Sequence, residues 1–352
     1  VIEESPSSLV DEDMRKEMGE QALLLAKAVN YSSAGTVEFV ASNDKSFYFL
    51  EMNTRLQVEH PVTELVTGID LVEKMINISA KKPLGLVQSD IKLNGWSVEA
   101  RIYAENPIRN FAPSIGRLRK FIPPTHEDMS IRLDSGVQEG GEISMYYDPM
   151  IAKLISYGED RIDACNKLST ALDAFVIKGV STNIPFVNSV LTNKKFLSGN
   201  ITTAFLEEEY PTGYTGLLKS KPKLFLISIT SLAMEAIEIK RKSKLTKGNY
   251  VVTTAKHYFE LKYEIISNDI NNLFKIKVEH NSKLYEVAVS WNIGDPILQI
   301  TLDAETFLMQ VSKILSKYNI CHAGFDVQSK VTECEIFNLS KLIPRKVKNT
   351  LS

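Results

Sequence analysis

The sequence predicts an α+β protein whose last third combines one helix with a small antiparallel β-barrel. Three observations predict this class. A helical apolar pattern over residues 9–30 precedes two strand-like runs, 36–41 and 46–51. Helical and strand-like patterns then alternate to about residue 210. Beyond residue 223, one helical segment precedes a series of strand-like runs separated by turn signals, which favours an antiparallel barrel or sheet wrapped on a helix.

Composition and charge exclude several classes of protein. The chain has 352 residues, 44% hydrophobic and 24% charged, which suffices for two or three domains with buried cores. A net charge of −2 lacks the basic excess of a nucleic-acid-binding protein. The most apolar run, 224–239, contains Glu235 and Glu238 and is shorter than the roughly 20 apolar residues of a membrane span. We therefore expect neither nucleic acid nor membrane among the partners.

The cysteines and histidines predict neither a zinc site nor a disulfide framework. Cys165, Cys321 and Cys334 form no Cys-x-x-Cys pair, and the five histidines are scattered. A reducing compartment is therefore expected. We interpret His60 as structural, although it follows an acidic residue.

Each predicted element of the first 210 residues has a local signal. The helix over 9–30 carries an apolar stripe that should be core: Met14, Met18, Ala22, Leu25 and Val29. Asp70 caps a helix that runs through Ala80. Its inward positions are expected to be Leu71, Val72, Met75 and Ile76. Strands are predicted at 97–103 and 151–157, and a helix at 160–177 buries Cys165.

The last third has a simpler pattern. A helix is expected over 224–242. The strand-like runs that follow are 250–266, 274–278, 284–291, 297–302, 307–311, 320–325 and 331–337. The residues from 344 to the end resemble the start of a linker. We find no chemistry-bearing motif in this part.

The chemistry is concentrated in residues 47–60. From Glu51, acid, amide and guanidinium groups occupy alternate positions up to Glu59, so an extended backbone places them on one face. A hairpin centred on residues 43–44 places Glu38 opposite Phe49, with Glu51 as its diagonal neighbour. Two carboxylates at that spacing suit a Mg²⁺ or Mn²⁺ ion. The alternative is an ordinary solvent-exposed strand face.

Residues 51–64, Glu-Met-Asn-Thr-Arg-Leu-Gln-Val-Glu-His-Pro-Val-Thr-Glu, resemble the signature of biotin carboxylases, the ATP-grasp ligases that carboxylate biotin. The resemblance continues through 98–107, 109–118 and 140–154 and fades near Tyr210. It implies the following division: the C-terminal part of an ATP-grasp domain (1–85), a biotin carboxylase C-terminal domain (86–209), a linker (210–223), a helix-and-barrel domain that docks another subunit (224–343), and the start of a linker (344–352).

The resemblance also implies roles for the residues of this stretch that bind metal and nucleotide. Glu38, Glu51 and Asn53 would hold Mg²⁺ or Mn²⁺, and Val40 and Leu50 would line the adenine side of an ATP site. ATP would be a substrate.

A second set of roles concerns bicarbonate and biotin. Arg55, Gln57 and the Val58 amide would grip bicarbonate, with Arg55 as a planar fork for a planar anion. Glu59 would be the general base that deprotonates it. Arg101 would stabilise the enolate oxygen of biotin. From the residues alone, Arg101 is a surface residue or the partner of Glu99.

Parts of the family's machinery do not occur in these 352 residues. The opening α/β subdomain, the glycine-rich lid and the ATP lysines of the first half are missing, as is a biotinyl carrier domain. We expect that the chain is part of a longer one and that it does not carboxylate biotin alone. The resemblance implies a hetero-oligomer with a carboxyltransferase beta subunit, in the bacterial cytoplasm or the mitochondrial matrix.

Two alternatives stay open at this point. The chain is a non-catalytic assembly module, or it belongs to a carboxylase for an acyl-CoA other than propionyl-CoA, such as methylcrotonyl-CoA or acetyl-CoA. The biotin carboxylase half does not choose between acyl-CoA substrates, because the other subunit selects the acyl-CoA.

Overall fold

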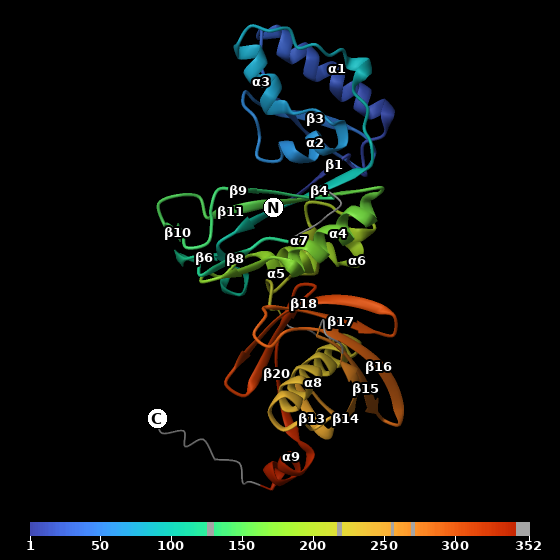
Figure 1. Cartoon of the computed structure of the whole chain (residues 1–352). Coiled ribbons are helices and arrows are strands. Elements are labelled where there is room, and N and C mark those ends of the chain that lie inside the picture. The colour runs from blue at the N-terminus through green and yellow to red at the C-terminus, as the bar shows by residue number, and fades with distance from the viewer. Residues whose placement is uncertain (125–129, 217–219, 255–256, 269–271, 343–352) are drawn as a thin grey trace, which may run out of the picture.

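The protein is built from three blocks arranged in a row, as the computed structural model shows (Figure 1). An N-terminal block of helices and a hairpin sits above a central sheet, and a barrel lies below it. The structure describes residues 1–124, 130–216, 220–254, 257–268 and 272–342. The predicted terminal linker, 344–352, lies outside the described residues. No helix in the described ranges is long and apolar enough to cross a membrane.

The N-terminal block consists of three helices and one hairpin. Its helices are α1 (Glu12–Ala28), α2 (His60–Thr67) and α3 (Leu71–Ser79), and its hairpin strands are β2 (Thr36–Ala41) and β3 (Phe47–Asn53). Asp11 caps α1 by accepting a hydrogen bond from the Met14 N–H at 3.0 Å. Asp70 caps α3 in the same way, as predicted, with 2.7 Å to the Glu73 N–H.

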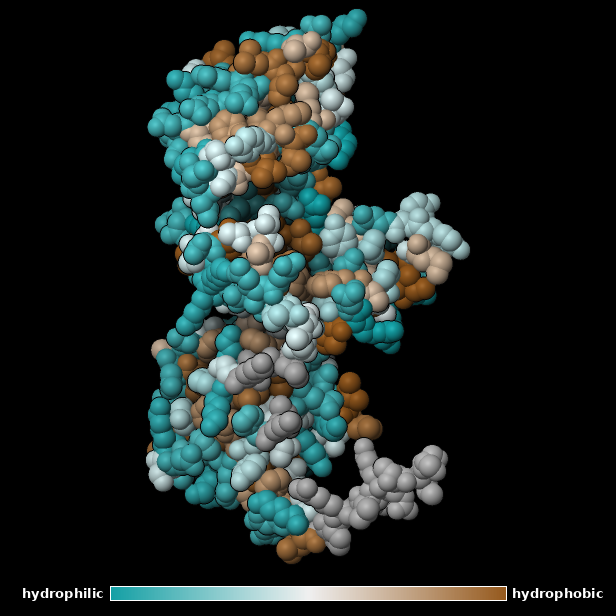
Figure 2. All heavy atoms as spheres, turned by 180° about the vertical axis from the view of Figure 1, so that it is seen from behind, coloured by the Kyte–Doolittle hydropathy of each residue, from teal (hydrophilic) through white to brown (hydrophobic). Residues whose placement is uncertain are grey.

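The prediction that the apolar stripe of α1 is core is wrong for most of its length. Of the five stripe residues only Met14 is buried, and Val29 is 64% exposed. On α3, Val72 and Ile76 are also exposed rather than inward. Figure 2 shows hydrophobic residues gathered on the surface of this block. Helical periodicity identified the helices and their apolar faces. It does not show whether a neighbouring element packs on such a face and buries it.

The central block is organised on a four-stranded antiparallel sheet in the order β1-β4-β11-β9. These strands are β1 (Ile2–Ser5), β4 (Trp96–Tyr103), β9 (Ile131–Ser135) and β11 (Met150–Gly158). Val98, Ala100 and Ile102 point to one face and pack on α4 (Arg161–Ala174). The opposite face carries charged side chains and faces α2. Cys165 is fully buried in the apolar layer, and burial raises the pKa of its thiol to about 11, so it is inert as predicted.

Short elements complete the central block. The strands are β5 (Glu105–Asn106), β6 (Ala112–Pro113), β7 (Gly116–Arg117), β8 (Lys120–Ile122), β10 (Glu142–Ile143) and β12 (Val176–Lys178). The helices are α5 (Ile184–Leu191), α6 (Lys194–Leu197), α7 (Phe205–Glu209) and two 3₁₀ turns, η1 (Gln88–Asp90) and η2 (Pro107–Arg109). In the predicted linker, Tyr214 is buried and its hydroxyl donates to the Gly324 carbonyl, which joins this region to the barrel.

The third block is a closed antiparallel barrel wrapped on one helix, as predicted. Helix α8 (Lys221–Ser243) is enclosed by strands in sequential order: β13 (Lys247–Thr254), β14 (His257–Asn268), β15 (Leu273–His280), β16 (Lys283–Ser290), β17 (Ile297–Leu302), β18 (Glu305–Ile314), β19 (Lys317–His322) and β20 (Phe325–Glu333). Ile229, Leu232 and Ala233 of α8 are fully buried against inward strand residues.

Two barrel predictions are wrong in detail. The run predicted as one strand over 250–266 is two strands, β13 and β14, paired with each other. The last predicted strand, 331–337, is the end of β20 followed by helix α9 (Cys334–Lys341). Neither boundary contains a glycine, proline, asparagine or aspartate, so the sequence carries no turn signal that would mark it.

A buried polar cluster fixes α8 inside the barrel. The hydroxyl of Tyr318, a residue with no exposed surface, donates to the carboxylate of Glu235 on α8. Lys313 of β18 joins β19 to α8: its Nζ lies 2.8 Å from the Tyr318 hydroxyl and 2.7 Å from Glu238 Oε2. Because each polar group meets another, the helix is held in one rotational setting.

Replacing Tyr318 by phenylalanine should lower the free energy of unfolding by about 1 kcal/mol, since the Glu235 carboxylate loses one donor and keeps Lys313. Urea unfolding of the full-length natural gene product measures this. Tyr258→Phe is the control, because Tyr258 is 63% exposed. Equal stability of the two variants would contradict this function of the cluster.

Candidate functional site

The hairpin brings the two predicted metal carboxylates closer than the sequence indicated. Glu38 lies directly opposite Glu51, and Phe39 lies opposite Phe49. The predicted pairing of Glu38 with Phe49 is therefore wrong. Leu50 is an extra residue in β3, a β-bulge that shifts the register by one position at this point. The bulge converts a diagonal pair of carboxylates into a direct cross-strand pair.

Amide side chains lie between these carboxylates. The Asn53 Nδ2 donates to Glu38 Oε1 at 2.8 Å and to Glu51 Oε1 at 2.9 Å. The Gln57 Nε2 donates to the same Glu38 oxygen. Two amide N–H₂ groups thus occupy the space in which two carboxylates would otherwise repel each other.

The extended interpretation of residues 51–59 is correct only as far as Asn53. β3 ends there, and the chain then turns and enters α2 at His60. The His60 Nδ1 contacts the Gln57 carbonyl at 2.8 Å, in keeping with a structural histidine. Gln57 reaches Glu38 by this turn rather than by strand alternation.

Glu59 and Arg101 meet across the boundary between two blocks. Glu59 precedes α2, and Arg101 lies on the charged face of β4. The Arg101 Nη2 is 2.8 Å from Glu59 Oε2 and 3.2 Å from Glu3 Oε1 on β1. Burial lowers the pKa of the guanidinium, but Tyr103 and the two carboxylates outweigh this and leave it above its ordinary value.

A lysine that the sequence analysis did not single out holds the same segment. The Lys153 Nζ on β11 donates to the Val58 carbonyl at 2.8 Å and pairs with Asp134 Oδ2 at 3.3 Å. The signal was a single lysine within the otherwise apolar run Ile151–Ile155. A cation in a buried strand needs a partner, and here the partner is the backbone that carries Glu59.

Helix α2 is fastened to the sheet by a further charged group. The Arg132 Nη1 on β9 donates to Glu64 Oε2 at 2.7 Å and its other nitrogens hold Asp134 at 2.8 and 3.0 Å. The contacts with Asp134 and Glu64 keep the pKa of Arg132 above its ordinary value in spite of burial. The other Glu64 oxygen accepts the Leu71 N–H at 2.8 Å, so α2 and the start of α3 are fixed together.

The remaining predicted residues lie at the surface of the hairpin. Arg55 is exposed and its Nη1 reaches only the neighbouring Leu56 carbonyl, at 3.3 Å. Val40 and Leu50 are 52% and 56% exposed. The structure thus assembles Glu38, Glu51, Asn53 and Gln57 in one group, and places Val58, Glu59 and Arg101 in a second group. It leaves Arg55, Val40 and Leu50 open to solvent.

The first group suits a hard divalent cation only in part. Glu38 and Glu51 direct one oxygen each at the Asn53 amide nitrogen, which occupies the position a cation would take. Carboxylate and amide oxygens are suitable ligands for Mg²⁺, and phosphate oxygens supply the rest in nucleotide sites. Within the described residues no group of three His, Cys, Asp or Glu side chains is arranged for a metal. Two carboxylates and an amide fit an ion that is shared with a nucleotide.

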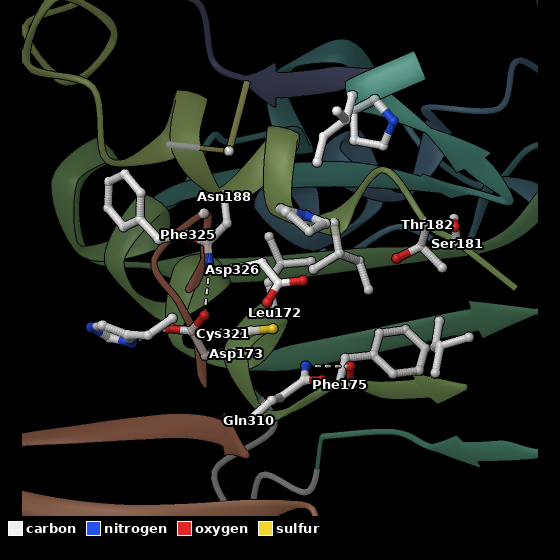
Figure 3. A pocket seen from close by; sticks show the side chains of 18 of the residues that line it. Leu172, Asp173, Phe175, Ser181, Thr182, Asn188, Gln310, Cys321, Phe325 and Asp326 are labelled. Atoms are coloured by element: carbon white, nitrogen blue, oxygen red, sulfur yellow. Dashed lines mark hydrogen bonds and ion pairs between the residues drawn. The ribbon is translucent and has the colours of Figure 1, made fainter. Parts of the chain in front are cut away.

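A cavity of about 260 Å³ lies elsewhere, between the central block and the barrel (Figure 3). Its charged wall is already satisfied: Asp173 of α4 accepts the Ala323 N–H at 3.0 Å and the Asn188 Nδ2 at 2.8 Å, and pairs with His322 at 2.7 Å. Gln310 of β18 donates to the Phe175 carbonyl at 2.9 Å. These contacts join α4 to the barrel, so we interpret the cavity as a packing junction.

Asp173→Asn should destabilise this junction by about 2 kcal/mol, because an amide cannot accept from all three donors and a buried N–H loses its partner. Limited proteolysis of the full-length gene product at residues 210–223 reports the loss as faster cleavage. Asp326→Asn is the control, since Asp326 borders the same cavity but is exposed. Equal cleavage rates in the two variants would contradict the inference.

Three family models match the chain in succession. Residues 1–87 match the ATP binding domain of the carbamoyl-phosphate synthase L chain, residues 99–208 the biotin carboxylase C-terminal domain, and residues 236–346 the propionyl-coenzyme A carboxylase BT domain. Domain by domain, the chain is therefore similar to the biotin carboxylase family of ATP-grasp proteins.

Within that family, the chain is similar along its length to propionyl-CoA carboxylase alpha chains. It is 40% identical over 375 residues to the Ruegeria pomeroyi protein, and the alignment covers 99% of this chain and 54% of that protein. It is 44% identical over 312 residues to the mitochondrial Homo sapiens protein, covering 85% and 42%. Biotin carboxylase 1 of Bacillus subtilis is 47% identical over 208 residues, or 59% of this chain and 46% of that one. The chain spans about half the length of these relatives.

Solved structures are similar to part of the chain. The biotin carboxylase domain of a thermophilic 2-oxoglutarate carboxylase, bound to bicarbonate, has 42% identity and a TM-score of 0.58 over 59% of this chain and 47% of that one. The same domain from Hydrogenobacter thermophilus, in complex with MgADP and bicarbonate, gives 42% and 0.58 over 59% and 46%. The biotin carboxylase subunit of pyruvate carboxylase gives 41% and 0.58, with 59% and 46% covered.

Proposed function

We propose that this chain supplies the second half of the biotin carboxylase site, and the docking barrel, of an acyl-CoA carboxylase alpha subunit. The observation that carries the proposal is the juxtaposition of Glu59 and Arg101, 2.8 Å apart, beside the Glu38–Glu51 pair. The reaction is the ATP- and bicarbonate-dependent carboxylation of biotin. The acyl-CoA is propionyl-CoA by similarity to the alpha chains, with methylcrotonyl-CoA and acetyl-CoA carboxylases as the alternatives.

Glu38, Glu51 and Asn53 would hold Mg²⁺ or Mn²⁺ together with the phosphates of ATP. The ion supplies neutralisation of phosphate charge during phosphoryl transfer. To do so, Asn53 would present its amide oxygen, and the two carboxylates would bind a cation in place of the amide donor. Val40 and Leu50, exposed on the same hairpin, provide apolar surface for the adenine side.

Arg55, Gln57 and the Val58 N–H would bind bicarbonate. Arg55 makes only one long contact and is free to turn its planar fork to the anion. Glu59 then accepts the bicarbonate proton, and the bicarbonate oxygen attacks the γ-phosphate of ATP with release of ADP. Arg101, which contacts Glu59, would stabilise the biotin enolate oxygen when Glu59 becomes neutral.

The proposal also concerns partners and place. Biotin would arrive on a carrier domain, and the barrel of α8 and β13–β20 would dock a carboxyltransferase beta subunit in a hetero-oligomer. Bacterial and mitochondrial relatives support the bacterial cytoplasm or the mitochondrial matrix. The division at residues 85/86, 209/210 and 223/224 stays a prediction. The end of α3 before the first border supports it, whereas the last border falls inside the first turn of α8, which begins at Lys221.

Carboxylation by the full-length natural gene product tests the activity. We expect carboxybiotin and ADP to form only when ATP, bicarbonate, biotin and Mg²⁺ are all present. Absence of bicarbonate-dependent ADP formation would overturn the proposal. The 352-residue chain alone should be inactive, and bicarbonate-dependent ATP hydrolysis by it would contradict that expectation.

Deletion of the residues from Leu224 onward tests the docking part separately. Pull-down with the carboxyltransferase subunit should fail for the truncated form, because α8 and the barrel form one packed unit that is lost together. Unchanged partner binding would exclude the barrel as the docking element. If the chain belongs to a non-catalytic assembly module, the full-length protein should bind the partner but form no ADP.

A further inference from the structure

Glu99, on the same strand as Arg101, carries a buried carboxylate that belongs to neither group of the candidate site. Glu99 lies two residues before Arg101 on β4, on the same face of the sheet, and has no exposed surface. Neither of its carboxylate oxygens has a hydrogen-bond partner among the described residues. An unsatisfied carboxylate in this position is costly, so its retention requires a physical reason.

Glu99 is next to two cations that hold the Val58–Glu59 segment. Arg101 contacts the Glu59 carboxylate, and Lys153 donates to the Val58 carbonyl. Arg101 and Lys153 are direct cross-strand partners on β4 and β11. Like charges in direct opposition destabilise a strand pair. Glu99 precedes Arg101 on its own strand and is diagonal to Lys153, so it is placed to compensate both charges.

Arg101 and Glu99 lie close together without forming a hydrogen bond. The Arg101 Nε is buried without a hydrogen-bond partner and is 3.9 Å from Glu99 Oε1, which is unpaired as well. A donor and an acceptor thus lie about 1 Å farther apart than the usual hydrogen-bond distance. The Arg101 Nη2 is meanwhile engaged with Glu59.

We propose that Glu99 is a positioning residue that keeps Arg101 and Lys153 in place and becomes the carboxylate partner of Arg101 when Glu59 is protonated. This inference rests on the proposed function. The proton of bicarbonate passes to the Glu59 carboxylate, which becomes neutral, so Arg101 keeps its positive charge and loses this anionic partner. The Arg101 Nε–H would then close onto Glu99 Oε1 and keep the guanidinium in its place. No bond to Glu99 forms or breaks.

The charged groups around Glu99 support this assignment from each neighbouring element. Glu3 of β1 lies opposite Glu99, Arg101 is on its own strand, Lys153 is on β11, and Glu59 precedes α2. The other titratable groups of α2, His60 and Glu64, contact each other and Arg132 instead. Burial raises the pKa of Glu99 to about 7, against the opposing effects of Lys153 and Arg101. Its charge therefore changes near neutral pH.

Steady-state kinetics of Glu99→Gln in the full-length gene product test the proposal. We expect kcat for biotin carboxylation to fall about 10- to 100-fold, with KM for ATP changed by less than about twofold, because the loss concerns orientation at the reacting groups. The ratio of wild-type to variant kcat should grow between about pH 6 and pH 8, since glutamine mimics the protonated carboxyl. Glu99→Asp, which restores the charge, should recover part of the loss.

Two controls separate positioning from structure. Glu238→Gln removes a buried carboxylate from the barrel and should leave kcat unchanged. Should Glu99→Gln fail to fold, Lys153→Gln replaces it, and a fall in kcat of similar size with normal ATP binding is expected. Wild-type kcat in Glu99→Gln at pH 8, or in Lys153→Gln, would overturn the inference while the proposed function stands. An inactive wild type would instead overturn the proposed function.

Discussion

Glu59→Gln in the full-length gene product should reduce bicarbonate-dependent ATP cleavage by about 10²- to 10⁴-fold, the range of a lost general base. Glutamine keeps the shape of the side chain and can still meet Arg101, whose Nη2 is 2.8 Å from the carboxylate. It cannot accept the bicarbonate proton. Rapid-quench measurement of ADP formation, with and without bicarbonate, gives the change directly.

The matched control for this experiment is Glu73→Gln. Glu73 lies on α3 in the same block, and its side chain is 59% exposed. Its variant should retain normal turnover. The Glu59 variant should also unfold at the same urea concentration as the wild type within the error of the measurement, because the 31% exposed side chain makes a single contact with Arg101. Retention of more than about a tenth of wild-type activity would contradict the base assignment.

The wild type should be less stable at pH 8 than at pH 5, and Glu99 should account for much of the difference. Burial raises the pKa of this carboxyl from 4.5 to about 7. The folded state therefore binds a proton more tightly than the unfolded state. Its stabilising contribution is complete below pH 4.5 and is lost as the pH rises through about 7, by roughly 3 kcal/mol in total.

Glu99→Gln should abolish this part of the pH dependence. Urea unfolding at several pH values measures it, as the difference between wild type and variant. The variant should be at least as stable as the wild type at pH 8, where the wild type buries a charge. A difference in unfolding free energy that does not change with pH would show that Glu99 does not titrate in this window. Greater stability with lower turnover is the compromise expected of a charge retained for activity.

Local patterns predicted the elements well, and pairing details poorly. The Asp70 cap, the hairpin, the buried Cys165 and the helix inside the barrel follow from spacing and residue type, which the chain carries locally. The bulge at Leu50 could not be predicted, because an apolar residue in an apolar strand gives no sign of an extra position. That single residue decides whether Glu38 and Glu51 are diagonal or directly opposed.

The candidate site was predictable to the extent that it is contiguous in sequence. Residues 51–59 contain most of the candidate residues, and the resemblance to the family signature singled them out. The contacts of Lys153 with Val58 and of Glu3 with Arg101 join residues about 95 and 98 positions apart, and only the sheet order brings them together. The exposed stripe of α1 shows the same limit, since periodicity does not indicate which neighbour covers a face.

The N-terminal block is an excursion from the central sheet, because strands β1 and β4 are neighbours although the whole block lies between them in sequence. The chain leaves the sheet at Ser5 and returns opposite it at Ser97. Both crossings lie side by side in the sheet, so two adjacent strands carry the whole block, and α2 packs back onto the same sheet. The Glu59–Arg101 pair joins the block to the sheet, together with the contacts of Arg132 with Glu64 and of Lys153 with Val58. Residues of one sheet thus both anchor the block by its two ends and hold its middle.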